Sequence, residues 1–400
     1  MIDRTHYLNN LLRFRDKSPI KVITGVRRCG KSTLLDLFEQ HLLRDGVPKE
    51  NIIRVNFEEM KFDKIKTYTE LNDYLVSVKP KSGMAYYIID EIQRVEKWEK
   101  AINSIRLDEN SDIYLTGSNA AMLSSELATV IAGRYVEIKM YPLSFSEYKI
   151  AYAETGKSDT DMFSGYLDDG GFPGLVEYAS DQTAKSIYLD GILNTILMKD
   201  VVSRGEVRDP SLMEKLLAYL ANNSSSPFSS QKIANYLTSA GRKTSAVTID
   251  SYVALLEKAF VIYRVGRYDI KGKGLLKTLG KVYFVDTGLK NLLSARSGFD
   301  YGNDLEGLVY FELARRARKV RVGKLGRLEV DFIAESEAGK SYYQVCASVM
   351  DSNVRDRELA PLRAIPDDYP KYLITTDRLP NSDFYGIRHV NILDFLSENS

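Results

Sequence analysis

The stretch Gly25-Val26-Arg27-Arg28-Cys29-Gly30-Lys31-Ser32 decides how the first third of this 400-residue chain folds. It matches the pattern G-x-x-x-x-G-K-[ST] in full. Residues 19–24 before it have the β-branched character of a buried strand, and residues 34–42 after it carry apolar side chains at helical spacing. A strand, a glycine loop and a helix in this order predict a phosphate-binding loop, because glycines let backbone N–H groups and the helix N-terminus surround an anion.

Two side chains of this loop have predicted roles in holding a nucleotide. Lys31 supplies a positive charge to the β- and γ-phosphates, and Ser32 offers its hydroxyl to Mg²⁺. The complete predicted nucleotide-binding set is Gly25, Arg28, Cys29, Gly30, Lys31, Ser32 and Thr33. Arg27 and Arg28 are expected to contact either phosphate or a neighbouring domain. A glycine-rich turn without a ligand is the alternative, which the flanking strand and helix disfavour.

A second apolar stretch ends in two carboxylates. Residues 86–91 read Tyr-Tyr-Ile-Ile-Asp-Glu, and such a near-continuous apolar run is typical of a central parallel strand covered on both faces. Ligands bind beside the carboxyl ends of these strands, so we predict that Asp90 holds Mg²⁺ and that Glu91 orients or polarises the attacking water. The acidic start of a helix is the alternative, because Asp and Glu also favour a first helical turn.

Three further segments complete a predicted five-stranded sheet. Residues 52–57, 112–116 and 134–138 have strand character, and helical crossovers between the strands predict a three-layer α/β domain. Asn119 follows one of these strands, and we expect it to contact the γ-phosphate or to position water, with Ser118 as a less favoured substitute. Both residue types also suit a helix N-cap.

The composition excludes several classes of function. Hydrophobic residues make up 44% and charged residues 27% of the chain, as in soluble globular proteins, and the length suggests about two to four domains. The chain lacks an apolar run of about 18 residues and a secretory signal, so we expect a cytoplasmic protein without a membrane partner. Only Cys29 and Cys346, and only His6, His41 and His389, occur in the sequence. These numbers exclude a disulfide framework and disfavour a histidine-based triad or a His-rich metal centre.

Charge is distributed unevenly along the chain. The net charge is +1, yet residues 260–330 hold 15 Lys+Arg against 7 Asp+Glu, a local balance of +8. This segment predicts a contact with the phosphate backbone of a nucleic acid. The alternative is a solvated or protein-docking face whose charge acidic neighbours balance in the fold.

The middle of the chain has the pattern of a winged helix. Three amphipathic helices and two short strands are predicted at residues 212–220, 230–237, 246–259, 261–265 and 281–285. The connection between the strands holds Arg267, Lys271, Lys273 and Lys277 among glycines. A winged helix can place its third helix in a DNA major groove and its wing on phosphates. It can equally serve as a lid or a protein-docking module of an ATPase.

Several motifs occur in the order found in a known family. The loop with its doubled arginine, Ile-Ile-Asp-Glu-Ile-Gln at 88–93, Leu-Thr-Gly-Ser-Asn at 115–119 and Tyr-Pro-Leu-Ser-Phe-Ser-Glu-Tyr at 141–148 resemble a family of AAA+-type P-loop ATPases. The resemblance implies an arginine that acts on the nucleotide in cis or in trans, and Arg134 is the candidate. A surface arginine on an edge strand is the alternative. Action in trans would require an oligomer.

In that family the ATPase core is followed by a winged-helix region and by a domain related to restriction-endonuclease folds. The resemblance therefore implies an ATPase core at 1–142, a helical linker or lid at 143–208, a winged-helix region at 209–298 and a restriction-endonuclease-like α/β domain at 299–400. Within the helical linker, the glycine-rich residues 170–174 predict a turn that a helix does not cross.

The last region resembles a metal-dependent nuclease that lacks one residue of its active site, a lysine. Glu306, Asp331 and Gln344 resemble the helix acid, the strand acid and the E/Q position of restriction-endonuclease-like metal sites. Those sites have a lysine two residues after the E/Q position, where this chain has Cys346. The resemblance thus implies an inactive, binding or structural domain. A polar helix face and a strand end are the alternative for Glu306 and Asp331.

The sequence as a whole predicts an ATPase with ATP and Mg²⁺ as ligands. Water attacks the γ-phosphate in line, and the cycle changes the conformation of appended domains that bind nucleic acid or protein. One alternative is a slow nucleotide-gated switch that acts by binding a protein. A second alternative is a metal-dependent nuclease controlled by ATP.

Overall fold

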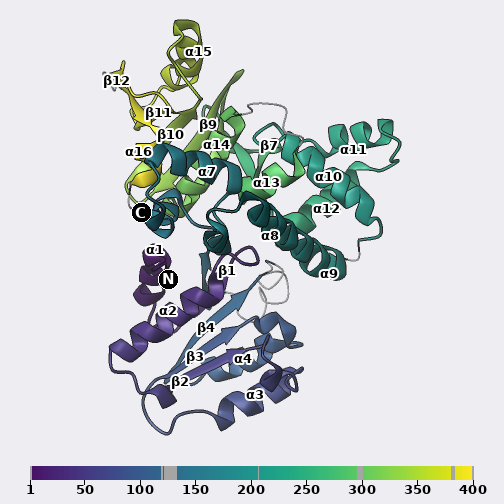
Figure 1. Ribbon diagram of the computed structural model, residues 1–400, viewed down its shortest axis with the longest axis vertical. Coiled ribbons are helices and arrows are strands. Elements are labelled where there is room, and N and C mark those ends of the chain that lie inside the picture. Colours follow the sequence, from purple (N-terminus) through teal and green to yellow (C-terminus); the bar gives the residue numbers. More distant parts are fainter. Residues whose placement is uncertain are drawn as a thin grey trace. The chain divides into compact units, whose positions relative to one another are not determined.

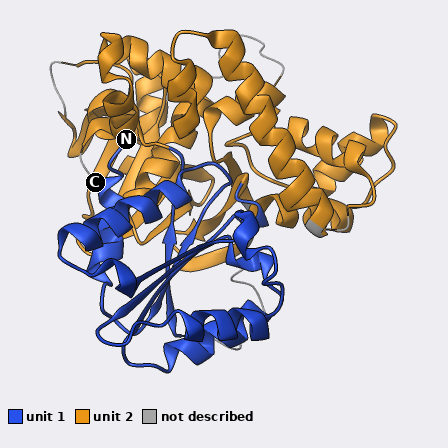
Figure 2. Cartoon of the chain, turned by 60° about the horizontal axis from the view of Figure 1, so that its bottom comes forward, with its two compact units in different colours: residues 1–142, 258–260 blue, residues 143–257, 261–400 orange. Residues whose placement is uncertain are grey.

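The computed structural model describes residues 2–118, 120, 133–205, 207–294, 301–379 and 383–398, with the backbone alone at Arg204, Lys277, Thr278 and Leu279. The chain divides into two compact units (Figure 2). The first unit is Met1–Pro142 with Lys258–Phe260, and the second is Leu143–Glu257 with Val261–Ser400. Each unit has a β-sheet and a hydrophobic core of its own.

The first unit is built on a five-stranded, all-parallel sheet (Figure 1). Its strands are β1 Ile20–Thr24, β2 Ile52–Asn56, β3 Ala85–Asp90, β4 Ser111–Gly117 and β5 Tyr135–Lys139. They lie in the order β2-β3-β4-β1-β5, so β4 separates the strand of the glycine loop from the strand that ends in the two acids. The predicted parallel-sheet α/β core is therefore confirmed.

Helices cover both faces of this sheet (Figure 1). They are α1 Thr5–Arg13, α2 Lys31–Arg44, α3 Tyr68–Ser77 and α4 Trp98–Arg106. Successive side chains of a strand point to opposite faces. On one face, Ile89 of β3 shares a core with Leu71 of α3 and Ile102 of α4. On the other face, the ring of Tyr114 in β4 lies 4.3 Å from that of Phe38 in α2.

Most of the described helices lie in the second unit. They are α6 Phe145–Ala151, α7 Asp159–Asp169, α8 Gln182–Thr195, α9 Ser203–Gly205, α10 Pro210–Asn222, α11 Ser230–Ser239, α12 Ala246–Lys258, α13 Thr287–Leu293, α14 Tyr301–Arg316, α15 Ser352–Arg363 and α16 Ile392–Ser397. The three helices predicted for the middle of the chain are present as α10, α11 and α12. Among the described residues, no helix combines the length and the apolar character that crossing a membrane requires.

The sheet of the second unit has eight strands in the order β12-β13-β11-β10-β9-β8-β6-β7. The strands are β6 Ile262–Asp269, β7 Gly274–Phe284, β8 Lys319–Leu325, β9 Leu328–Ser336, β10 Gly339–Val345, β11 Lys371–Thr375, β12 Asp383–Phe384 and β13 Ile387–Asn391. Helices α14 and α15 pack on opposite faces. Phe332 lies 6.0 Å from the ring of Tyr310 in α14, and its neighbour Ile333 shares a core with Leu359 of α15.

The hairpin of β6 and β7 belongs to this sheet and is not a separate wing. β6 pairs in parallel with β8, so that Arg267 lies opposite Val322. The boundary predicted between residues 298 and 299 therefore falls between strands of one sheet. The sequence did not indicate this pairing, because β6 and β8 are far apart along the chain and local residue patterns do not show which distant strands pair.

A buried carboxylate holds the predicted glycine turn in place. Asp286 caps α13 by accepting from the N–H of Leu289 at 3.1 Å, and its other oxygen accepts from the N–H of Gly171 at 2.7 Å. A Cβ atom on Gly170, whose φ is +80°, would lie 2.1 Å from the Asp286 carboxylate. The turn therefore requires glycine. Burial raises the pKa of Asp286 to about 6, although the N–H groups around it oppose the shift.

The raised pKa of Asp286 makes the stability of the second unit depend on pH. Between pH about 4 and about 6, the folded protein holds a proton on this carboxyl that the unfolded chain releases. Stability of the wild type relative to Asp286→Asn should therefore fall as the pH rises through this interval, by on the order of 3 kcal/mol, and then stay level. Chemical denaturation of both proteins from pH 4 to pH 8 measures the difference. A difference that does not change with pH would contradict the raised pKa.

Candidate functional site

The loop between β1 and α2 turns back on itself through residues with positive φ. Gly25, Arg28 and Gly30 have φ angles of 151°, 68° and 101°. A Cβ atom on Gly25 would lie 2.1 Å from the carbonyl oxygen of Met140, so the close approach requires glycine. Helix α2 begins at Lys31 directly after Gly30, and its first N–H groups therefore face the loop.

Lys31 lies inside this loop. It is buried, and its Nζ atom donates to the carbonyl oxygens of Gly25 at 2.9 Å and Val26 at 3.0 Å. Ser32 is exposed and Thr33 is half-buried in the first turn of α2. One loop thus carries both the ammonium and the hydroxyl that the sequence predicts for a triphosphate and its Mg²⁺.

The side chains of Arg28 and Cys29 point in different directions. Arg28 is exposed, whereas Cys29 is buried and its thiol donates to the carbonyl oxygen of Met140 at 3.6 Å. The N–H of Cys29 donates to the carbonyl oxygen of Val26 at 3.3 Å. Cys29 therefore stabilises the loop through contacts of its thiol and its N–H inside the first unit, and its role in binding a nucleotide stays a prediction.

The hydroxyl of Thr116 links the Asp90 side chain to the Glu91 backbone where β3 and β4 end. Asp90 is 1% exposed and Glu91 is 9% exposed. The hydroxyl of Thr116 donates to Asp90 Oδ1 and accepts from the N–H of Glu91 at 3.1 Å. Gln93 donates to Glu91 Oε2. Thr116 is absent from the predicted set, because only the strand order shows that β4 lies beside β3.

The electrostatic surroundings of Glu91 suit a proton acceptor. Burial raises its pKa, and the charges of Lys31 and Arg27 oppose the shift. A carboxylate with a raised pKa takes a proton from water more readily than an ordinary one. The charge of Lys31 thus acts on Glu91, although the two residues are 60 positions apart in the sequence.

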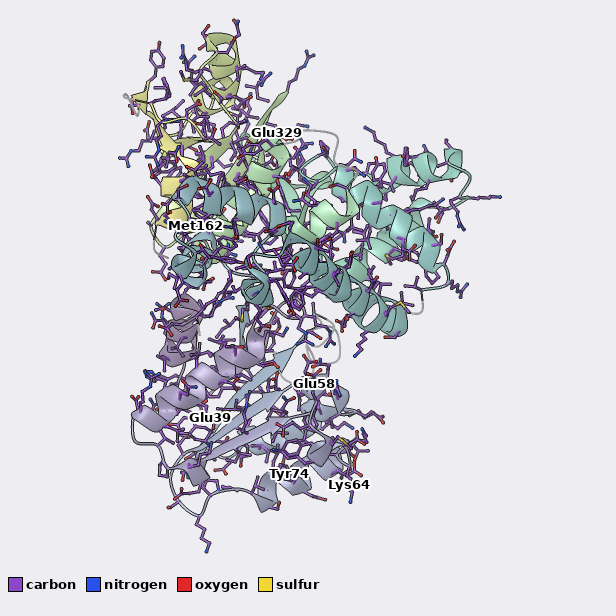
Figure 3. All side chains as sticks on the ribbon, in the orientation of Figure 1. Glu39, Glu58, Lys64, Tyr74, Met162 and Glu329 are labelled. Carbon is purple, nitrogen blue, oxygen red and sulfur yellow. The ribbon has the colours of Figure 1, made fainter. Side chains whose placement is uncertain are left out.

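Arginines surround the same edge of the sheet. Arg54 of β2 donates to Asp36 of α2 at 2.9 Å and lies 3.9 Å from Asp90 Oδ2. Glu58, which follows β2 (Figure 3), accepts from Arg94 at 3.1 Å and lies 3.7 Å from Arg27. These contacts tie β2 and the end of β3 to the glycine loop through Arg27 and to α2 through Asp36.

The remaining predicted site residues have different outcomes. Arg134 directly precedes β5, which runs parallel to β1, so it lies at the edge where the strands begin. Across the five residues of β1, the two edges are roughly 16 Å apart at ~3.3 Å per residue. Arg134 donates to Asn103 at 3.1 Å, and the fold does not bring it to the loop of its own chain. Asn119 lies outside the described residues. Ser118 is buried and accepts from Arg27 at 3.5 Å.

The donor set at this edge fits Mg²⁺ bound together with a nucleotide. Mg²⁺ usually takes one or two carboxylates and completes its shell with phosphate oxygens and water. Asp90 and Ser32 supply a carboxylate and a hydroxyl at the same edge. In the part of the chain that the structure describes, no group of three or more His, Cys, Asp or Glu residues is arranged to hold a metal by itself.

The basic segment of residues 260–330 is partly neutralised inside the second unit. Ion pairs within the described residues engage at least Arg264, Arg267, Lys281, Lys290, Arg315, Arg316 and Arg321. Arg267 pairs with Glu329 at 3.0 Å and its side chain is 11% exposed, so it is not the free phosphate contact that the sequence predicted. The side chain of Lys277 lies outside the described part.

Comparisons with known proteins agree with this geometry. A family model described as an AAA domain matches residues 17–149, and a model for a domain of unknown function (DUF8612) matches residues 160–300. A Walker-type ATPase of Pyrococcus abyssi has a similar structure, with a TM-score of 0.52 and 17% identity, over 73% of this chain and 96% of the Pyrococcus chain. The parallel fold, the glycine loop and the AAA match over residues 17–149 identify this first part of the chain as an AAA-type ATPase domain.

Two uncharacterised proteins are similar along most of the chain. One, from Haemophilus influenzae, is 40% identical over 399 residues, which cover 99% of this chain and 98% of that protein. The other, from Methanocaldococcus jannaschii, is 31% identical over 369 residues, which cover 87% of this chain and 79% of that protein. The chain belongs to the family that these proteins share.

Thr116 should act as a positioning residue for ATP hydrolysis. Thr116→Val keeps the shape of the buried side chain but removes the hydroxyl that joins Asp90 to the backbone of Glu91. We expect kcat to fall roughly 10- to 100-fold, because small displacements of reacting groups are costly, with little change in the KM for ATP. Thr116→Ser restores the hydroxyl and should restore kcat. Steady-state kinetics of both variants test this, and a normal kcat in Thr116→Val would show that the hydroxyl has no positioning role.

Proposed function

We propose that the first unit hydrolyses ATP in a Mg²⁺-dependent reaction and that this cycle changes the conformation of the second unit. The loop from Gly25 to Thr33 binds the phosphates, with Lys31 neutralising the β- and γ-phosphates. Ser32 and Asp90 hold Mg²⁺, which when bound neutralises charge on the phosphate oxygens. Glu91 orients the attacking water and accepts its proton.

One observation carries this proposal. The glycine loop that holds Lys31 follows β1 and the two acids follow from β3, yet the parallel sheet brings both strand ends to one edge. There the Thr116 hydroxyl contacts the Asp90 carboxylate and the Glu91 backbone, and the charge of Lys31 acts on the Glu91 carboxylate. A general base with a raised pKa beside a phosphate-binding loop is the arrangement that attack by water on the γ-phosphate needs. A slow switch that acts by binding a protein would use the same residues but would turn over ATP very slowly.

Two substitutions separate nucleotide binding from chemistry. Lys31→Ala removes a charge from the phosphates, so nucleotide affinity should be lost while the fold is kept. Glu91→Gln keeps the size and shape of the side chain but removes the carboxylate that would accept the proton of water. Mg-ATP should therefore still bind, while the rate of hydrolysis should fall by roughly 10²-fold or more. Titration with a fluorescent ATP analogue and a phosphate-release assay measure the two effects. Glu96→Gln, which changes an exposed carboxylate on the same segment, is the matched control and should behave as the wild type.

Unchanged affinity in a folded Lys31→Ala protein would contradict the assignment of the loop. A normal rate in Glu91→Gln would show that another residue orients the water. If the wild type itself turns over very slowly, and neither duplex nor single-stranded DNA stimulates it, the nucleotide-gated switch is the better description.

We further propose that a basic tip of the second unit contacts nucleic acid. Lys271 and Lys273 lie in the turn between β6 and β7, and Lys324 and Arg327 lie at the turn between β8 and β9. Because β6 and β8 are parallel and Asp269 lies opposite Lys324, both turns are at the same end of the sheet. Lys271, Lys273 and Arg327 are exposed. Flexible cations of this kind contact a phosphate backbone without reading bases. The order α10, α11, α12, β6, β7 supports a winged-helix origin for residues 209–298, although the hairpin now pairs with β8. The pattern of Glu306, Asp331 and Gln344 supports a restriction-endonuclease-like origin for residues 299–400.

Binding through the basic tip should depend steeply on salt. Replacing Lys271, Lys273, Lys324 and Arg327 by Gln removes four cations and should flatten the log–log salt dependence of DNA affinity by up to about 3.6, at about 0.9 per phosphate contact. Fluorescence anisotropy at several salt concentrations measures this slope, and ATP hydrolysis without DNA should not change. The control replaces four exposed lysines of the first unit, Lys61, Lys64, Lys66 and Lys100. A wild type without salt-sensitive DNA binding in either nucleotide state would make the tip a solvated or protein-docking face.

A further inference from the structure

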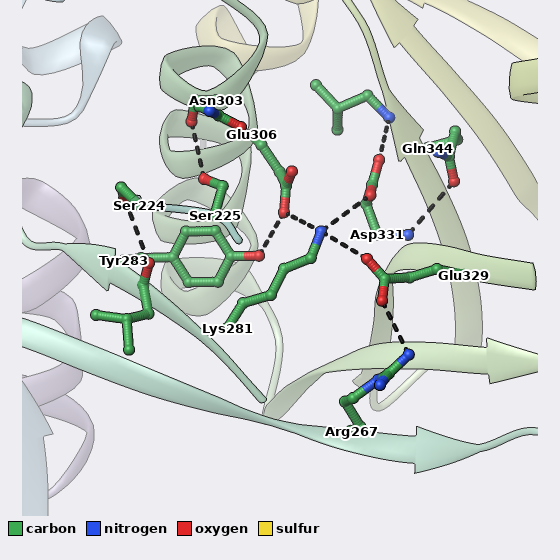
Figure 4. Close-up of polar contacts among 12 residues, drawn as sticks. Ser224, Ser225, Arg267, Lys281, Tyr283, Asn303, Glu306, Glu329, Asp331 and Gln344 are labelled. Atoms are coloured by element: carbon green, nitrogen blue, oxygen red, sulfur yellow. Dashed lines mark hydrogen bonds and ion pairs between the residues drawn. The ribbon is translucent and has the colours of Figure 1, made fainter. Parts of the chain in front are cut away.

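A buried lysine of the second unit stands among three carboxylates (Figure 4). Lys281 Nζ, from β7, donates to Glu306 Oε1 at 2.8 Å and lies 3.0 Å from Glu329 Oε1 and 3.4 Å from Asp331 Oδ1. Lys281 is 4% exposed, and Glu306 and Asp331 are 8% and 7% exposed. Burial by itself would lower the pKa of the ammonium, but attraction by the three carboxylates outweighs burial and holds the pKa above its ordinary value. Lys281 therefore stays charged.

The carboxylates are fixed by further hydrogen bonds. Glu306 on α14 also accepts from the hydroxyl of Tyr283 at 2.5 Å, and Asp331 on β9 accepts from the N–H of Val345 at 2.9 Å. An ammonium has three N–H donors, and three carboxylates surround this one. The cluster is thus a cation site for which the chain supplies the cation.

Glu306 and Asp331 are the acids for which the resemblance to restriction endonucleases implies a divalent metal, but the surroundings do not fit one. A divalent ion needs carboxylate oxygens at about 2.0–2.6 Å, and here the same oxygens face the ammonium, whose charge would repel it. Gln344 is engaged as well, since its oxygen accepts from the N–H of Asp331 at 3.4 Å and its nitrogen donates to Glu358 at 3.0 Å.

Restriction-endonuclease-like metal sites have a lysine two residues after the E/Q position, but in this chain that position supplies no cation. Cys346 occupies that position, and burial together with the neighbouring carboxylates raises the pKa of its thiol to about 12. The thiol is therefore neutral at physiological pH. The cationic group of this region comes instead from Lys281, on a strand earlier in the chain.

We propose that Lys281 is the permanent cation of this cluster and takes the place of a divalent metal ion, so that the second unit neither needs nor binds a metal there and does not cut nucleic acid. The ammonium joins β7 to α14 and β9 and so fastens the β6–β7 hairpin to the rest of the sheet. Without a metal, the site has no Lewis acid to activate water. This inference concerns the second unit alone and does not depend on ATP hydrolysis.

Removing the ammonium should convert the cluster into a metal site. Lys281→Met keeps the length of the side chain but leaves the carboxylates unpaired, and we expect the melting temperature of the nucleotide-free, full-length protein to fall by roughly 5–15 °C. Saturating Mn²⁺ should recover roughly 5 °C of this loss by binding the folded state. Electron paramagnetic resonance should show one bound Mn²⁺ more than in the wild type, and Lys281→Met/Asp331→Asn should lose it.

Lys185→Met is the matched control. Lys185 lies in the same unit and forms an equally buried ion pair, but with the single carboxylate of Asp169 at 2.7 Å. This variant should also lose stability, and Mn²⁺ should not restore it, because a single carboxylate without phosphate oxygens holds a divalent ion too weakly.

The wild type provides a test that does not rely on any Lys281 variant being folded. Mn²⁺ binding to the nucleotide-free wild type should equal that of Glu306→Gln and Asp331→Asn, and wild-type protein with Mn²⁺ should leave DNA intact. A Mn²⁺ site that these substitutions remove, or DNA cutting that Asp331→Ala abolishes, would overturn the proposal in favour of an active metal site. A folded Lys281→Met protein that is as stable as the wild type, or that binds no additional Mn²⁺, would overturn it as well.

Discussion

Parallel pairing of β1, β4 and β3 is the constraint on which the first unit depends. The register places Ile23 opposite Thr116 and Ile89 opposite Leu115, so the glycine loop and the two acids emerge at one edge of the sheet. Because side chains alternate along a strand, a slip of one residue would turn Thr116 away from Asp90. The backbone hydrogen bonds of this sheet therefore position the site. The loop supplies the groups that bind phosphate, and the end of β3 supplies the two acids.

Buried polar and charged side chains stabilise each unit from within. Each of these side chains contacts a partner from a distant part of the same unit's sequence. In the first unit, the ammonium of Lys21 is completely buried against Asp112, which also accepts from the hydroxyl of Tyr114. In the second unit, Lys281 sits among three acids and Asp286 holds the glycine turn. Burying a charge is costly unless a partner compensates it. Each of these clusters therefore limits which elements can pack together.

The sequence was least informative where the outcome depends on pairing between distant strands. Arg134 has the right spacing for an arginine that acts on the nucleotide, but the parallel direction of β5 places it at the opposite edge from the loop of its own chain, so only action in trans stays a prediction. The β6–β7 hairpin has the local pattern of a wing, yet it pairs with β8, which lies beyond the predicted boundary at residue 298. Arg267 belongs to a basic run and is nevertheless ion-paired to Glu329. The spacing of residues along the sequence predicts neither the direction of a strand in a sheet nor the partner of a salt bridge.

The sequence by itself determined the glycine loop, the two acids after an apolar strand, the parallel α/β core and the three helices of the middle region. These features follow from residue type and spacing within some ten to fifteen neighbouring residues, where helical and strand periodicity act. Only the tertiary structure decided that Thr116 joins the two acids and that Lys281 occupies the acidic cluster of the second unit. These contacts join residues 26 and 50 positions apart, and such a contact forms only after the sheet has brought its strands together.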